Sequence, residues 1–233
     1  MQEIELQELF AEWKEKDKHA GQIFNYDGIV CKEAWDLQEK KILFLLKEAY
    51  HDDGKFISEN QKHEYDLAYD LCENGPWNNI WHRVAEWAYG IIETTSSEIA
   101  PYKKLDESQA NFYLKQIAVM NIKKSGGKSN SEDKDLMQYA EMDAYEILKE
   151  IELINPDIII CCYTIGYLIS ALEKLDQDPS IVLIDKKEHP SDNYHYKWKN
   201  RIVIDYYHPA ARYPALLSYY GLLGSYKHAI SET

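Results

Sequence analysis

Short apolar runs separated by amphipathic stretches dominate the pattern of hydrophobic positions along the chain. Four runs rich in β-branched residues are predicted to be buried strands: Ile42–Leu46, Ile117–Ile122, Asp157–Cys162 and Arg201–Tyr206. A weaker fifth run covers Ile181–Ile184. Because the four main runs are apolar continuously rather than at alternate positions, we expect helices to cover both faces of the sheet.

Helical periodicity occurs between the predicted strands. It is clearest over Lys134–Ile154, and it is also present over Tyr163–Leu175 and Ala211–Leu223. The alternation predicts a three-layer α/β/α fold with a four-stranded parallel sheet, or a five-stranded one if the weaker run joins it. No repeat or linker divides the chain, so residues 1–233 are expected to form one domain. Within it, 1–40 is predicted to be an N-terminal helical extension and 51–116 a helical insertion.

Composition and charge narrow the possible classes of function. No apolar run is long enough to span a membrane, and the acidic, amphipathic N-terminus does not resemble a secretion signal, which predicts a cytoplasmic protein. The formal net charge of −14 argues against nucleic-acid binding driven by charge alone, since such binding neutralises phosphates with Lys and Arg. Two local segments, 115–128 and 197–212, are nevertheless basic and leave phosphate contacts open.

The cysteines give no metal-binding pattern. The chain has four of them, Cys31, Cys72, Cys161 and Cys162, and no CxxC pair. Cys161 and Cys162 are adjacent on a predicted strand, so their side chains should point to opposite faces, which suits one metal ion poorly. We therefore predict free thiols and no metal, iron–sulfur cluster or other cofactor.

Polar side chains follow the predicted strands at the edge where open α/β sheets bind their ligands. Glu48 follows the first strand, Asn121 ends the second and His208 follows the fourth. Taken singly, these are explained as a solvent-facing acid, a turn-capping amide and a hydrogen-bonded histidine. Their occurrence at three strand ends of one sheet favours a functional site instead.

A glycine-rich stretch, SGGKS over 125–129, suggests a phosphate-binding P-loop. That motif needs a further glycine five residues before Gly127, and Ile122 occupies the position. The stretch is therefore interpreted as a basic loop, either close to a phosphate backbone or simply at the surface.

The order of these segments resembles the uracil-DNA glycosylase superfamily, over roughly residues 42–223. KEAYHDDG (47–54) resembles its first motif, with Glu48 at the acidic position, and AVMNIKKSGGKSN (118–130) resembles its Asn-containing strand and loop. YYHPAAR (206–212) resembles its His-Pro motif. Two features differ, since Lys47 replaces the glycine of the first motif and no proline follows Ala49.

The resemblance implies hydrolysis of the N-glycosidic bond of uracil, or of another modified or damaged base, flipped out of DNA. Glu48 would stabilise positive charge on the sugar and orient water, and His208 would donate a hydrogen bond to the departing base. Asn121 would read the edge of the base, against an aromatic wall formed by Tyr50 or Trp77. The candidates for contacts with DNA phosphates are Lys123, Lys124, Lys128 and Arg212.

Two alternatives come from other classes of function. One is a binding module that keeps the fold without catalysis, and the other is an N-glycosidase acting on a free nucleoside or nucleotide, which suits the acidic charge better. The surroundings of Glu48 distinguish an enzyme from a binding module, since a catalytic acid should be partly buried in a cleft facing His208. Asp52, in the same loop, is the next candidate for the acid.

Overall fold

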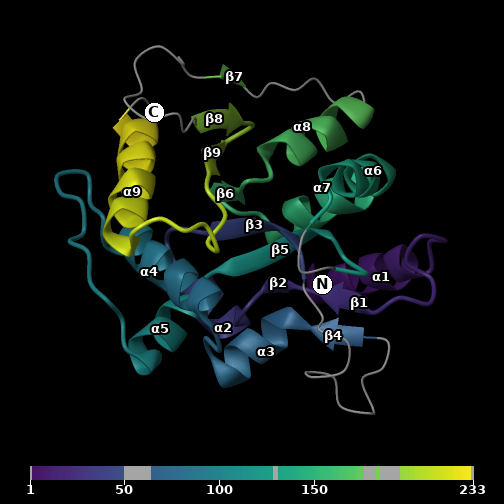
Figure 1. Cartoon of the computed structure of the whole chain (residues 1–233), viewed down its shortest axis with the longest axis horizontal. Helices are drawn as coiled ribbons and strands as arrows, with labels where there is room; N and C mark the ends of the chain where they lie inside the picture. The colour runs from purple at the N-terminus through teal and green to yellow at the C-terminus, as the bar shows by residue number, and fades with distance from the viewer. Residues whose placement is uncertain (1, 50–63, 128–130, 176–181, 184–194, 232–233) are drawn as a thin grey trace.

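A computed structural model describes residues 2–49, 64–127, 131–175, 182–183 and 195–231 of the chain (Figure 1). Its helices are α1 (Gln2–Lys14), α2 (Lys32–Leu37), α3 (Leu67–Asn74), α4 (Asn79–Glu93), α5 (Glu107–Leu114), α6 (Asp133–Met142), α7 (Ala144–Ile154), α8 (Ile165–Lys174) and α9 (Ala215–Ser231). Its strands are β1 (Phe24–Tyr26), β2 (Gly28–Ile29), β3 (Ile42–Glu48), β4 (Glu64–Asp66), β5 (Ala118–Lys123), β6 (Ile158–Cys162), β7 (Val182–Leu183), β8 (His195–Trp198) and β9 (Arg201–Tyr206).

The main sheet is mixed and its centre is parallel. Over the described residues its strand order is β2-β5-β3-β6-β9-β8-β7, and β1 and β4 form a separate pair. The four predicted strands are the central ones, β5, β3, β6 and β9, and they pair with one another in parallel. Antiparallel β2 extends one edge, and antiparallel β8 and β7 extend the other.

The prediction of a four- or five-stranded parallel sheet is therefore wrong in size and in strand direction at the edges. The weaker apolar run contributes Val182–Leu183 to β7, which pairs antiparallel with β8. The edge strands β2 and β8 have two and four residues and leave no apolar run in the sequence, which is why the pattern does not predict them.

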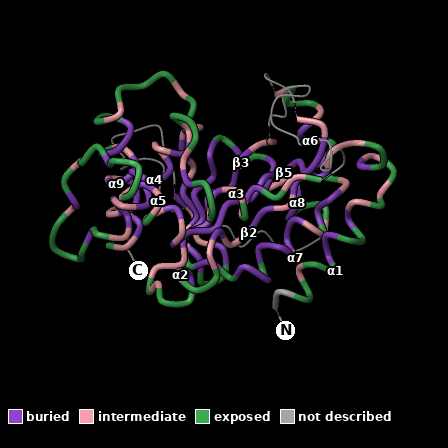
Figure 2. Tube along the Cα trace, turned by 90° about the horizontal axis from the view of Figure 1, so that it is seen from below, coloured by how far each residue is buried: buried purple, intermediate pink, exposed green. Residues whose placement is uncertain are grey.

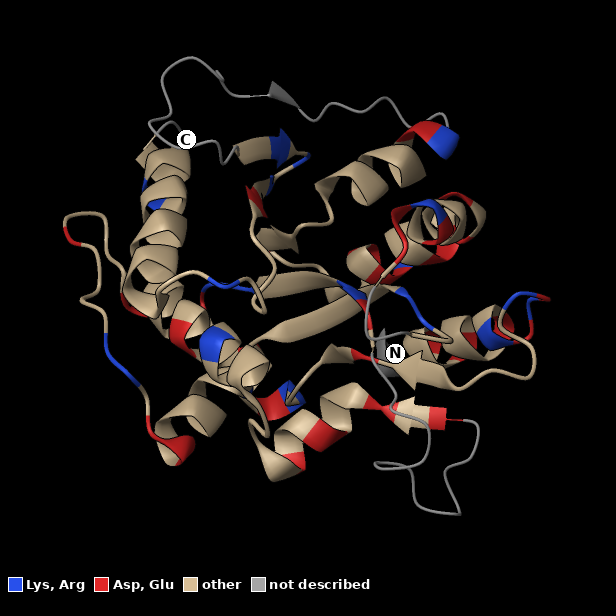
Figure 3. Ribbon diagram, in the orientation of Figure 1, with Lys and Arg blue, Asp and Glu red and all other residues tan. Residues whose placement is uncertain are grey.

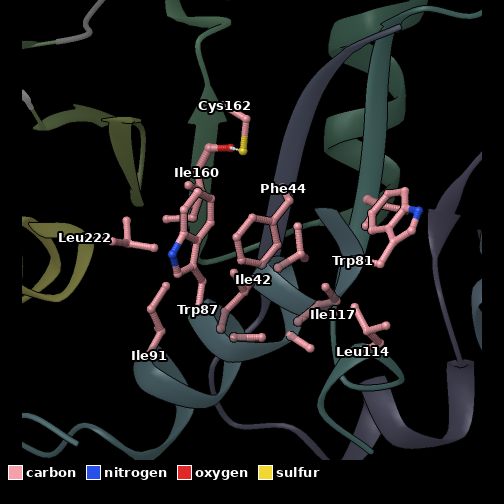
Figure 4. Packing of buried hydrophobic residues seen from close by; sticks show 14 of the residues in the cluster. Ile42, Phe44, Trp81, Trp87, Ile91, Leu114, Ile117, Ile160, Cys162 and Leu222 are labelled. Atoms are coloured by element: carbon pink, nitrogen blue, oxygen red, sulfur yellow. Dashed lines mark hydrogen bonds between the residues drawn. The ribbon is translucent and has the colours of Figure 1, made fainter. Parts of the chain in front are cut away.

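Helices cover both faces of the sheet, so the expected three layers are present. Side chains alternate along β3: Ile42, Phe44 and Leu46 pack with residues of α3, α4, α5 and α9. Leu43 and Leu45 pack with residues of α1, α6, α7 and α8 on the other face. Figure 4 shows the first cluster, in which Phe44 stacks on Trp87 with ring centroids 6.5 Å apart. The four parallel strands form the buried centre of the molecule (Figure 2).

Two predicted helices have different bounds in the structure. The helix predicted over Lys134–Ile154 is divided at Asp143 into α6 and α7. The Asp143 carboxylate is fully buried and binds Lys16 and His19, contacts that periodicity does not reveal. The helix predicted from Ala211 begins at Ala215, directly after Pro214; before it, the carbonyl groups of residues 209, 211 and 213 accept hydrogen bonds from Arg83 on α4, as described below.

The N-terminal region is more than a helical extension. Besides α1 and α2 it supplies β1 and β2, and β2 is an edge strand of the main sheet. The insertion predicted over 51–116 does contain three helices within its described part, α3, α4 and α5. No helix among the described residues is both long and apolar enough to cross a membrane.

Candidate functional site

Glu48 and His208 lie at the same edge of the sheet, the carboxyl edge of its parallel strands. The register pairs Leu45 with Cys161 and Cys161 with Asp205. β3 ends at Glu48 and β9 ends at Tyr206, two residues before His208, and β6 lies between these two strands. This edge is where a ligand of an open α/β sheet binds.

Glu48 is a buried acid held by a lysine. Its side chain is 4% exposed, and its Oε2 lies 3.2 Å from Nζ of Lys123, the residue opposite it on β5. Lys123 Nζ also binds Oδ2 of Asp135 on α6 at 2.6 Å. Burial opposes the charge of Lys123, but hydrogen bonds and attraction from Asp135 and Glu48 outweigh it and raise the Lys123 pKa. The ammonium therefore stays charged and fixes the orientation of the Glu48 carboxylate.

His208 is a neutral hydrogen-bond donor. Burial, assisted by the positive charge of Lys47, lowers the His208 pKa from 6.5 to about 4. Its Nδ1 accepts a hydrogen bond of 3.1 Å from the amide of Ala210. Since Nδ1 is an acceptor, the proton of the neutral ring is on Nε2, which can donate to a ligand.

Arg83 on α4 holds the loop that carries His208. Its Nη1 donates to the carbonyl oxygens of Pro209 at 2.7 Å and Ala211 at 2.6 Å, and its Nη2 donates to that of Tyr213 at 3.4 Å. Sequence reasoning missed this residue, because one arginine on an amphipathic helix carries no signal of its partner more than a hundred residues away.

Lys47 and Tyr163 form a further part of the edge. Lys47 Nζ lies 4.8 Å from the centroid of the Tyr163 ring and 3.4 Å from Oδ1 of Asp133. Tyr163 follows β6 with a left-handed backbone, φ 62°, and its amide donates to the carbonyl of Tyr206 at 2.7 Å. This turn brings an exposed aromatic ring beside Lys47, the residue that replaces the motif glycine.

Asn121 does not face this site, which corrects the expectation that it reads the edge of a base. It is 2% exposed, and its backbone amide and Nδ2 both donate to Oδ2 of Asp27, at 2.8 and 3.1 Å. Asp27 directly precedes the edge strand β2. The amide that resembles a ligand-reading group instead fastens the N-terminal region to β5.

Lys124 is a buried structural lysine rather than a contact for phosphates, which corrects a second expectation. Its side chain is fully buried; Nζ binds Asp27 and lies 2.7 Å from Oε2 of Glu150. The rings of Phe10 and Trp13 complete its surroundings. Lys123 is also engaged in ion pairs, with Glu48 and Asp135. Its side chain is 4% exposed, so it presents little charge to a nucleic acid.

The remaining candidates differ in their surroundings. Trp77 is 41% exposed just before α4, with its ring 5.6 Å from that of Trp81, and α4 contacts the His208 loop through Arg83. Arg212 is exposed in the same loop. Tyr50, Asp52 and Lys128 lie outside the described residues.

A hydrogen-bonded serine, histidine and aspartate also occur in the structure. His19 Nδ1 lies 2.6 Å from Ser125 Oγ, and His19 Nε2 lies 2.8 Å from Asp143 Oδ2. The arrangement resembles a hydrolytic triad, but each of the three residues is 2% exposed or less. With the nucleophile covered, the group serves to join three segments of the chain.

No protein-family model matches the chain, and no curated protein matches it. The fold and the site therefore define the class: an α/β protein with a carboxylate and a neutral imidazole at the carboxyl edge of its parallel strands. Among the described residues, no cluster of three or more His, Cys, Asp and Glu side chains is arranged to hold a metal ion.

Proposed function

We propose that the protein hydrolyses N-glycosidic bonds and belongs to the uracil-DNA glycosylase type, with Glu48 and His208 as its catalytic residues. One observation carries this proposal: Glu48 ends β3 and His208 follows β9, both at the carboxyl edge of the parallel strands, with Glu48 oriented by Lys123 and His208 uncharged. Glu48 and His208 are also the residues to which the resemblance to the uracil-DNA glycosylase superfamily assigns catalytic roles.

In the proposed reaction, the bond between the sugar carbon and the base nitrogen breaks as a water oxygen bonds to that carbon. Positive charge develops on the sugar, and the Glu48 carboxylate stabilises it and accepts a proton from the water. The base leaves with negative charge, which the Nε2–H group of His208 stabilises by a hydrogen bond. The positive charge of Lys47, which helps to lower the His208 pKa, also favours the negative charge on the departing base.

A second candidate, an N-glycosidase of free nucleosides or nucleotides, is supported by the burial of the lysines. Of the four residues expected to contact DNA phosphates, Lys123 and Lys124 are buried in ion pairs. With a net charge of −14, such a surface suits a small substrate better than a polyanion.

The test compares both kinds of substrate with one enzyme preparation. Oligonucleotides bearing uracil, hypoxanthine, xanthine or hypermodified cytosine are assayed for alkali-labile abasic sites, and the corresponding nucleosides and nucleotides for free base by chromatography. Release of base that Glu48→Gln abolishes supports the proposal. Release from nucleosides or nucleotides alone selects the second candidate. If no base is released from any of these substrates, the proposal is wrong and the binding module is favoured.

A further inference from the structure

Two partly exposed thiols from distant parts of the chain are neighbours in the structure. Cys31 directly precedes α2 and Cys72 lies within α3, and their side chains are close enough to interact. Both line a cavity of about 340 Å³ that lies beside β2, with Tyr26, Asp27 and Asp66 among its other lining residues. The other two cysteines, Cys161 and Cys162, are fully buried in β6.

From this geometry we propose that Cys31 and Cys72 are a redox modification site, at which hydrogen peroxide produces an intramolecular disulfide. The proposal is independent of the glycosidase site. It needs the two sulfurs to be close together and open to a small oxidant. The interaction between the thiols supports the first condition, and the cavity that both line supports the second.

The surroundings of the thiols make Cys31 the first to react. Its Sγ donates to Oε2 of Glu33, an exposed residue, at 3.3 Å. Cys31 has an extended backbone and its side chain caps no helical amide, so no backbone amide holds the sulfur. Burial, and then the contact with Cys31, raise the pKa of the Cys72 thiol, which disfavours its thiolate. Cys72 is therefore the resolving thiol.

The reaction balances with one peroxide molecule. The Cys31 sulfur attacks one peroxide oxygen, the O–O bond breaks, and a sulfenic acid and water form. The Cys72 sulfur then attacks the Cys31 sulfur, the S–O bond breaks, and the S–S bond forms with release of a second water. The two thiols lose two electrons and two protons in total, and the peroxide gains both.

Peroxide treatment of the full chain, followed by denaturation and thiol titration, tests this proposal. The unmodified protein has four cysteines, and two titratable thiols should remain after oxidation. Non-reducing peptide mapping should find Cys31 joined to Cys72, with the intact mass lowered by two hydrogens and restored by dithiothreitol. Cys31→Ser and Cys72→Ser should each abolish the link, whereas Cys161→Ala, a matched change at a buried thiol, should keep it.

A second measurement does not depend on oxidation. Phenylarsine oxide binds two thiols only when they are adjacent, so the reduced protein should take up one equivalent, and either serine variant should take up none. The proposal is overturned if all four thiols survive peroxide, if the sulfurs become sulfinic acids without a link, or if the link joins two chains. Failure of the arsenical to bind the reduced protein overturns it as well.

Discussion

Burial acts in opposite directions on two residues at one end of β9. It raises the pKa of the Asp205 carboxyl from 3.8 to about 6 and lowers that of the His208 imidazole from 6.5 to about 4. In both cases removal from water favours the uncharged form. Near pH 5 the folded protein therefore keeps both residues uncharged, whereas in the unfolded chain both are charged.

These shifts predict opposite effects of pH on stability. The folded pKa of His208 is depressed, so between pH 4 and 6.5 the unfolded chain binds the extra proton and the His208 contribution grows as pH rises. The folded pKa of Asp205 is raised, so between pH 3.8 and 6 the folded chain binds the extra proton and the Asp205 contribution falls as pH rises. Each change amounts to about 2–3 kcal/mol after allowance for partial exposure, so the two nearly cancel.

Single variants separate the two contributions. Relative to the unmodified protein, Asp205→Asn should gain unfolding free energy as pH rises from 4 to 6, and His208→Asn should lose it over the same range. Urea unfolding at four or five pH values measures both differences. Two variants whose differences from the unmodified protein do not change with pH would contradict the assigned shifts.

The catalytic proposal is tested at Glu48. Glu48→Gln keeps the size of the side chain and removes its charge, while Lys123 retains its bond to Asp135. Loss of one preorganised charged group should lower the single-turnover rate about a hundredfold to a thousandfold, and His208→Ala should lower it by a similar factor. Asp36→Asn, at an exposed acid paired with Lys32 on α2, is the matched control and should leave the rate unchanged. A Glu48→Gln rate equal to that of the unmodified protein would move the acid to Asp52.

At the scale of elements, a buried polar network joins α1, β5, α7 and the segment before β2. Lys124 lies at its centre, between Asp27 and Glu150, under the aromatic rings of α1. Burial raises the Glu150 pKa well above its ordinary value, against the attraction of Lys124. The raised pKa favours the neutral form of Glu150, which leaves one ammonium facing one carboxylate, that of Asp27.

Removal of the lysine should therefore destabilise the protein strongly. Lys124→Met leaves Asp27 charged, buried and unpaired, so the unfolding free energy should fall by about 3–5 kcal/mol. Glu150→Gln should cost less, because it replaces one neutral group by another. Lys103→Met, at an exposed lysine, should change stability by less than about 0.5 kcal/mol. Urea denaturation measures these changes in unfolding free energy. If Lys124→Met lowers the unfolding free energy no more than Lys103→Met does, Lys124 is not a buried structural lysine.

At the scale of the whole molecule, negative charge is spread over several elements. Figure 3 shows acidic positions on α1, α3 and α6, with basic positions interspersed among them. Two of the lysines that the sequence suggests for contacts with DNA phosphates, Lys123 and Lys124, are buried. Among the described candidates for these contacts, Arg212 is exposed. Any binding to DNA should therefore involve few phosphate contacts.

The salt dependence of DNA binding follows from this count. The logarithm of the affinity for a labelled oligonucleotide should fall with the logarithm of salt concentration at a slope of about −1 to −2. Arg212→Gln should reduce that slope by about one, whereas Lys103→Gln should leave it unchanged. Fluorescence anisotropy between low and physiological salt measures both. A slope of −4 or steeper would mean that basic residues other than the candidates contact the phosphates.

The sequence alone determined the centre of the sheet and, to within about two residues, the ends of its parallel strands. Continuous apolar runs are sufficient to identify the four parallel strands, because a strand covered on both faces has no polar side to obscure the pattern. Chain order then places Glu48 and His208 after two of these strands, and parallel strands bring such positions to one edge. Local pattern carries this information, since both steps depend only on neighbouring residues and on strand direction.

Only the tertiary structure decided what each polar side chain binds. In the sequence, Asn121 looks like a ligand-reading group and Lys124 like a phosphate-binding group. In the structure, both bind Asp27, which lies more than ninety residues earlier in the chain. Arg83 became part of the site because α4 packs beside the His208 loop. Such contacts depend on which distant segments the fold brings together, and the energetic need to pair a buried polar group leaves no periodic trace in the chain.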